Sequence, residues 1–124
     1  MTKRQSISTE VRITNKKTGG QKGVKEARFD LIPPGPMWEL ARVYGRGAAK
    51  YEDRNWERGY NWGLSYGAMQ RHLVAFWGGE YNDEETGLPH LAHAMWHCCT
   101  LMQFQENFPE MDDRSKLRAG REEE

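Results

Sequence analysis

The sequence lacks long hydrophobic runs. Only 37% of its 124 residues are hydrophobic, and its mean hydropathy is −0.93. A membrane-spanning helix needs about 20 consecutive apolar residues, and the first ten residues contain no apolar segment like that of a secretory signal. We therefore expect a cytoplasmic protein with no membrane partner. Its polar tails would surround a compact middle, or its core would be completed by oligomerisation.

An excess of charge of one sign is also missing. Lys and Arg number 18 and Asp and Glu number 18, which gives a formal net charge of +0, and the sequence pI is about 6.9. A nucleic-acid-binding domain normally carries a basic excess. The composition therefore argues against nucleic acid as a partner.

Cysteine is scarce, and nucleophile motifs are absent. Cys98 and Cys99 are adjacent, so on a helix their side chains diverge and cannot cross-link the fold. We expect a reducing compartment, with both cysteines as buried packing residues. The sequence has no Gly-x-Ser-x-Gly motif and no cysteine in an electropositive setting. Water activated by a metal is then the simplest hydrolytic chemistry.

Composition divides the chain into three parts. Residues 1–27 form a basic polar arm, residues 28–109 a helical domain, and residues 110–124 a charged tail that we expect to be frayed or disordered. Within the arm, residues 11–20 fit either a short strand and a turn or a mobile segment.

The middle of the chain predicts an all-α fold, a small bundle of about three to four helices. The first helix should begin near Pro36, because proline is favourable in the first turn. Ser65 is a plausible N-cap for the second helix, and Gly78-Gly79 should end it. The third helix should cover residues 89–106.

This third helix is apolar on nearly every side. A helix with that pattern is normally buried all round, and three helices of one short chain can hardly enclose it. We therefore expect a homodimer or homotetramer with this helix at its centre.

Histidine is concentrated in one place, because all four histidines lie between His72 and His97. His90, His93 and His97 are spaced i, i+3, i+7 and so share one helix face. The turn before them is acidic, with Glu80, Asp83, Glu84 and Glu85. Imidazoles facing carboxylates suit a divalent metal, either Mg²⁺ or Mn²⁺, with Zn²⁺ or Co²⁺ as alternatives.

A plainer interpretation stays open for this cluster. The carboxylates would form a solvated turn that complements the N-terminal dipole of the third helix. The histidines would be hydrogen-bonded groups of the core or of a subunit interface. His97, deepest in the helix, is the weakest candidate ligand.

Two other segments offer groups that suit a nucleotide. The first contains Lys50, Tyr51, Asn55 and Trp56, which would neutralise phosphate, stack on a base and read a base edge or sugar. Its alternative is a loop packed on the bundle through its aromatic rings. The second contains Lys22 and Arg28 in and beside a glycine-bearing stretch, which would either fold over anionic groups or form a flexible basic arm.

Three blocks, taken together and in order, carry a resemblance. They are DLIPP at residues 30–34, GAAKYEDRNW at 47–56 and RHLVAFWGGEYNDEETGLPHLAHA at 71–94. In this order and spacing they resemble the phage-encoded dATP/dGTP diphosphohydrolase family. The resemblance implies a small α-helical enzyme that uses a divalent metal to cleave a purine deoxynucleoside triphosphate to the monophosphate and pyrophosphate. It also implies a role in remodelling the nucleotide pool during phage infection.

The family pattern falls on particular residues of this chain. Its histidine and acidic positions are His72, Glu80, Asp83, His90 and His93, and its G-A-x-K-Y…N-W block supplies Lys50, Tyr51, Asn55 and Trp56. The chain departs from the related MazG-like pyrophosphohydrolases, which carry metals on E-x-x-E and E-x-x-D helix pairs. Here the helix face reads H-x-x-H, so either histidines replace carboxylates or the site lies elsewhere. The His-Asp dipeptide of HD phosphohydrolases is absent.

From these residues we assign roles on physical grounds. The expected metal ligands are Glu80, Asp83, His90 and His93. The expected catalytic groups are His72 and Glu85, for proton transfer or ligand support, and Arg71, for phosphate charge. The expected substrate-binding residues are Lys50, Tyr51, Asn55, Trp56, Lys22 and Arg28. A metal-bound water would attack the α-phosphorus of a purine deoxynucleotide.

Two other functions stay open at this point, besides a purely structural helical oligomer. One is a non-catalytic module that binds a nucleotide or a metal, as a sensor or a sequestering protein. The other is an HD-type phosphohydrolase that releases triphosphate or phosphate. Identifying the reaction products distinguishes all three.

Overall fold

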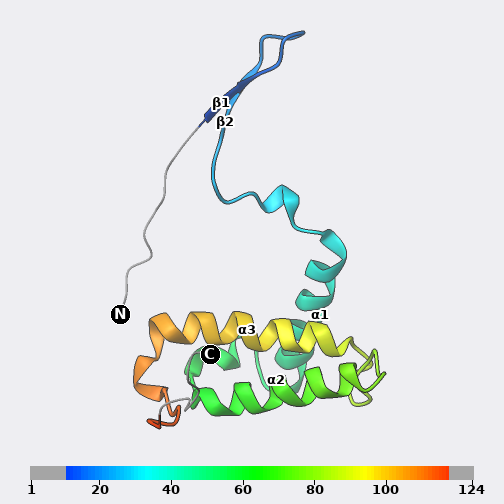
Figure 1. Cartoon of the computed structure of the whole chain (residues 1–124), viewed down its shortest axis with the longest axis vertical. Coiled ribbons are helices and arrows are strands. Elements are labelled where there is room, and N and C mark those ends of the chain that lie inside the picture. The colour runs from blue at the N-terminus through cyan, green and yellow to red at the C-terminus, as the bar shows by residue number, and fades with distance from the viewer. Residues whose placement is uncertain (1–10, 118–124) are drawn as a thin grey trace, which may run out of the picture.

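The computed structural model describes residues 11–117 and begins with a β-hairpin. Strands β1 (Val11–Thr14) and β2 (Gln21–Val24) pair antiparallel, with Val11 opposite Val24. The turn is locally encoded, because the Asn15 side chain accepts the backbone N–H groups of Lys17 and Thr18 at 2.9 and 3.1 Å. Figure 1 shows the hairpin standing away from the helices. The all-α prediction is therefore wrong for this segment, and the strand-and-turn alternative is confirmed.

Three α-helices make up the body of the part of the chain that the structure describes. Helix α1 covers Pro34–Lys50, with proline in its first turn. Helices α2 (Trp62–Trp77) and α3 (His90–Asn107) lie side by side and antiparallel, and α1 packs against α3 (Figure 1). Short 3-10 helices η1 (Phe29–Leu31), η2 (Asn55–Arg58) and η3 (Pro109–Met111) occupy the connections. The predicted three-helix body is confirmed.

The start of α2 was predicted wrongly. It begins at Trp62, and Ser65 lies inside the helix with only 1% of its surface exposed. The Ser65 hydroxyl contacts the Tyr60 hydroxyl and the His97 ring instead of a helix N-terminus. The local sequence predicts that the Ser65 side chain caps the helix. In the folded protein its hydroxyl instead makes a tertiary contact with His97.

The segment after α3 folds back onto the start of α2. Asp113 accepts the backbone N–H of Gly63 at 2.8 Å, which satisfies one of the free donors of the first turn. The Trp62 indole donates to the carbonyl of Phe108 at 3.1 Å. Asp113 is therefore held against the start of α2, and at this point of the chain the prediction of a frayed or disordered tail is wrong. Residues 118–124, like residues 1–10 of the predicted arm, lie outside the described part of the chain.

The core has two parts, both on α3. Val43, Leu88 and Ala92 pack together near its start. Nearer its end, Phe104 is fully buried, with its ring centroid 4.9 Å from that of Tyr60. Such rings contribute hydrophobic burial and edge-to-face contact together.

The single chain leaves part of α3 uncovered, contrary to the pattern of a helix buried all round. Leu91 is 43% and Met102 is 70% exposed. Cys98 and Cys99 are free and exposed, so the prediction that they are buried is wrong for one chain. Within residues 11–117 no helix is long and apolar enough to cross a membrane.

Candidate metal centre

The connection between α2 and α3 folds back on itself and carries an acidic side chain to the start of α3. The backbone N–H of Asp83 donates to the carbonyl of Leu88 at 2.8 Å, and the N–H of Gly87 donates to the carbonyl of Asp83 at 2.7 Å. Gly87 has φ of 72°, a value that favours glycine. This closed turn fixes Asp83 beside His90, the first residue of α3.

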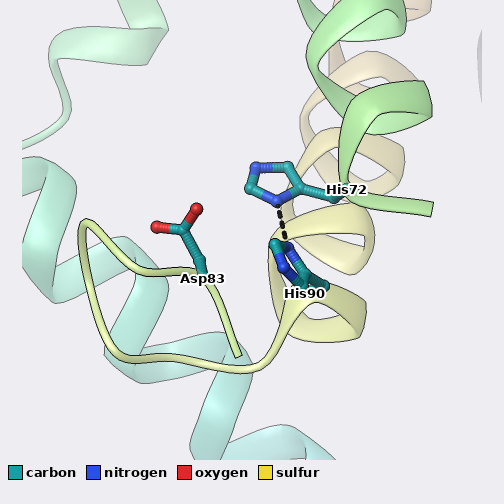
Figure 2. Close-up of side chains that lie close together, drawn as sticks. All are labelled: His72, Asp83 and His90. Atoms are coloured by element: carbon teal, nitrogen blue, oxygen red, sulfur yellow. Dashed lines mark hydrogen bonds between the residues drawn. The ribbon is translucent and has the colours of Figure 1, made fainter. Parts of the chain in front are cut away.

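Two histidines and one aspartate form the centre of the site. His72 comes from the middle of α2, His90 from the start of α3 and Asp83 from the turn between them (Figure 2). One ligand atom from each of the three lies within 4.8 Å of the others. The Nδ1 atoms of His72 and His90 are 2.9 Å apart. Two nitrogens and an oxygen at this spacing form a donor set that transition metals accept.

His90 is the most buried member, with 5% of its surface exposed. Its Nε2 atom has no hydrogen-bond partner within the described part of the chain, and the Glu80 carboxylate is 3.7 Å away. A buried ring nitrogen without a hydrogen-bond partner lowers the stability of the folded protein by about 1–3 kcal/mol. The arrangement therefore fits a bound cation, which would interact with the His90 Nε2 atom and the Glu80 carboxylate.

His93 lies next to this centre and is held by Thr86. Its Nε2 atom is 2.8 Å from the Thr86 hydroxyl and 3.9 Å from the Asp83 carboxylate. Burial lowers the pKa of His93, and the nearby Asp83 charge only partly opposes that effect. Burial also works against ionisation of Asp83, but hydrogen bonds from Thr86 outweigh it and lower the pKa of that carboxyl.

The imidazoles stack against one another across α2 and α3. The rings of His72 and His93 are parallel within 5°, with centroids 4.4 Å apart, and His97 lies 6.1 Å from His72. Burial first, and then the neighbouring His93, lower the pKa of His72. Neutral imidazole is the form that binds metals, so the stack favours ligation near neutral pH.

His97 is the last histidine of the cluster along α3. Its Nδ1 is 2.9 Å from the Ser65 hydroxyl, which in turn contacts the Tyr60 hydroxyl. Burial lowers the pKa of His97 to about 4. These contacts support the interpretation of His97 as a hydrogen-bonded packing residue.

The structure places Lys50 and Glu85 at the edge of the cluster. Lys50 Nζ is 3.4 Å from the Glu85 carboxylate and 5.3 Å from the centroid of the Tyr51 ring. All three side chains are exposed. The end of α1 and the acidic turn therefore meet, and Tyr51 presents a free aromatic surface beside them.

Asn55 and Trp56 lie farther into the fold, on η2. The Trp56 ring is 6.0 Å from Tyr44 and 6.4 Å from Phe104 between centroids, and both residues are half-buried. For Trp56 the contacts match the alternative in which the loop packs on the bundle. Its predicted role at the substrate stays a prediction, as does that of Asn55.

The three remaining predicted residues are all on the surface or the arm. Arg71 is exposed on α2, next to His72. Lys22 is on β2, and Arg28 pairs with Asp30 at 2.7 Å. In one chain the hairpin stands apart from the helices that carry the histidines (Figure 1), so Lys22 is not brought to the cluster. Substrate roles for Lys22 and Arg28 stay predictions.

Two supporting residues were missed in the sequence. Thr86 links Asp83 to His93, and Ser65 links Tyr60 to His97. A threonine three residues after an aspartate and directly before a glycine is a recognisable turn signal. The sequence gives no comparable signal for Ser65, whose partners are five and 32 residues away.

The fold and the cluster define a small helical protein with a histidine–carboxylate cluster that could hold a metal ion. Comparison with known proteins gives the family. Residues 16–114 match the family described as dATP/dGTP diphosphohydrolase, N-terminal, and the chain belongs to it.

A relative named dATP/dGTP diphosphohydrolase, from Salmonella phage PMBT28, is 35% identical over 89 residues. The match covers 72% of this chain but only 30% of the relative. The chain thus spans less than a third of that protein. No solved structure matches the chain.

Proposed function

We propose that the protein hydrolyses a purine deoxynucleoside triphosphate, dATP or dGTP, to the monophosphate and pyrophosphate in a metal-dependent reaction. Membership of the family and the name of the phage relative support the reaction class. The observation that carries the proposal is the convergence of His72, Asp83 and His90 ligand atoms within 4.8 Å. A phage setting would make this activity a means of remodelling the nucleotide pool in the host cytoplasm.

The residues present fit a divalent cation. Asp83 supplies a hard carboxylate oxygen and the two imidazoles supply nitrogens. His90 Nε2, which has no hydrogen-bond partner among residues 11–117, lies 3.7 Å from the Glu80 carboxylate. Mixed nitrogen and oxygen donors favour Mn²⁺, Co²⁺ or Zn²⁺ over Mg²⁺. When bound, such an ion would supply charge for the phosphates and acidify a water molecule.

The side chains around the centre supply the other functions. Lys50 and Arg71 are exposed cations that would bind the triphosphate. Glu85, which Lys50 holds at 3.4 Å, would accept a proton from the attacking water. Tyr51, 65% exposed, offers a ring on which the purine would stack.

Product identification tests this proposal. Each of the eight common nucleoside triphosphates is incubated with the protein and Mg²⁺ or Mn²⁺, with and without a chelator. We expect dATP or dGTP to give monophosphate and pyrophosphate only in the metal-containing samples. Asp83→Asn should abolish turnover, whereas Asp53→Asn, an exposed aspartate in the 51–61 connection, is the matched control and should not.

Other products point to the other functions. Nucleotide binding without turnover would indicate a sequestering or sensor module. Release of inorganic triphosphate or phosphate would indicate the HD-type reaction.

We also propose that the protein assembles as a homodimer or homotetramer. Large apolar side chains are exposed along α2 and α3: Leu64, Tyr66, Val74, Trp77, Leu91 and Met102. Burying some of them against a second copy would favour self-association, and the chain's neutral net charge does not oppose it. Light scattering on the purified protein should give a multiple of 14.4 kDa, and Trp77→Lys should lower it.

A further inference from the structure

Thr86 occupies a position between the acidic turn and the histidine stack. Its hydroxyl oxygen is 3.0 Å from Asp83 Oδ2 and 2.8 Å from His93 Nε2, and it accepts the backbone N–H of Leu88 at 3.2 Å. Its own backbone N–H donates to the same Asp83 oxygen at 3.0 Å. The side chain is therefore fixed from three sides.

These contacts determine where the protons lie. A hydroxyl has one proton to donate and two lone pairs to accept with. An ionised Asp83 can only accept, so the Thr86 hydroxyl donates to it, and the Leu88 amide uses one of the two lone pairs. The remaining contact, to His93, requires the ring to donate. His93 therefore carries its proton on Nε2, which leaves Nδ1 bare when the ring is neutral.

The orientation of His93 matters because its ring lies flat on another one. The His93 and His72 planes differ by 5° at a centroid separation of 4.4 Å. His72 in turn directs its Nδ1 at His90 Nδ1, 2.9 Å away. A rotation of His93 would therefore remove the surface against which the candidate ligand His72 rests.

We propose that Thr86 is a positioning residue: it fixes the proton of His93 on Nε2 and, through the stacked rings, orients His72 at the metal centre. The part that concerns metal binding rests on the proposed function. The proton position on His93 does not, because it follows from the hydrogen bonds alone. Partners of metal-binding side chains typically change metal affinity by about 10- to 100-fold when removed.

The test uses the full chain with Thr86→Val, which keeps the shape but removes the hydroxyl, and Thr86→Ser, which restores it. Thr100→Val is the matched control, since Thr100 is a buried threonine that bonds Tyr44 and lies two turns farther along α3. Nitrogen-15 NMR of the histidine rings reports the tautomer, and calorimetric titration with Mn²⁺ or Zn²⁺ reports metal affinity.

We expect wild type, Thr86→Ser and Thr100→Val to show His93 protonated on Nε2. Thr86→Val should lose that single tautomer and bind metal about 10- to 100-fold more weakly, whereas the serine variant stays within a few-fold of wild type. A wild-type His93 protonated on Nδ1 would overturn the proposal, even if the valine variant failed to fold. Unchanged tautomer and metal affinity in Thr86→Val would overturn it too. Absence of hydrolysis with the expected tautomer would refute only the proposed function.

Discussion

The half-buried ring of His97 predicts how the stability of the protein depends on pH. The pKa of this ring is lowered from 6.5 to about 4, so the unfolded chain binds a proton more readily than the folded chain. Between these two values, unfolding takes up a proton and lowering the pH favours the unfolded state. Stability is therefore complete above pH 6.5 and is lost progressively as the pH falls toward 4.

The size of this effect follows from the same shift. Moving from pH 8 to pH 5 would cost about 2 kcal/mol if the full shift applied. His97 is only half-buried, so solvent screening reduces this to about 1 kcal/mol. Burial likewise lowers the pKa of His72 and His93, which adds to the loss with the same sign.

Urea unfolding at several pH values measures the effect. His97→Asn keeps a polar atom near the position of Nδ1, which contacts Ser65, but does not titrate. The variant should be less sensitive to pH than wild type by about 1 kcal/mol between pH 8 and pH 5. An equal pH dependence in the two proteins would refute the account of a neutral, half-buried His97.

Three other changes test the packing and the site. Phe104→Ala, at a fully buried ring, should lower the free energy of unfolding by about 3–5 kcal/mol in urea titrations. Asp113→Ala removes the acceptor for the Gly63 N–H and should cost about 1 kcal/mol by the same assay; no loss would contradict the capping role. Lys50→Ala breaks only exposed contacts, with Glu85 and with the Tyr51 ring, so the urea midpoint should stay constant while KM for the triphosphate rises. An unchanged KM would remove Lys50 from the proposed substrate contacts.

Much of the helical body could be predicted, because its signals are local. The end of α2 at Gly78 and the start of α3 after Pro89 follow from residues that stop or begin helices. The start of α2 could not be placed in this way. Asn61 and Ser65 are both cap-forming residue types, and the contacts of Ser65 with Tyr60 and His97 form only in the folded protein.

The sequence indicated which residues belong to the site, but it did not indicate which of them contact one another. Helical spacing places His90 and His93 on one face, yet it does not tell that His72 bonds one of them and stacks on the other. That arrangement depends on the closed turn from Asp83 to Leu88 and on the hydroxyl of Thr86. The contacts of Trp56 with Tyr44 and Phe104 likewise could not be predicted, because they form only when the helices pack together.

Hydrolysis of dGTP in ¹⁸O-labelled water with Mn²⁺ tests the central claim most directly. The family and the His72–Asp83–His90 cluster lead us to propose that water attacks the α-phosphorus. Mass spectrometry should then find the label in dGMP and none in pyrophosphate, and a chelator should stop the reaction. Label in pyrophosphate, release of inorganic triphosphate, or turnover that survives the chelator would contradict the account.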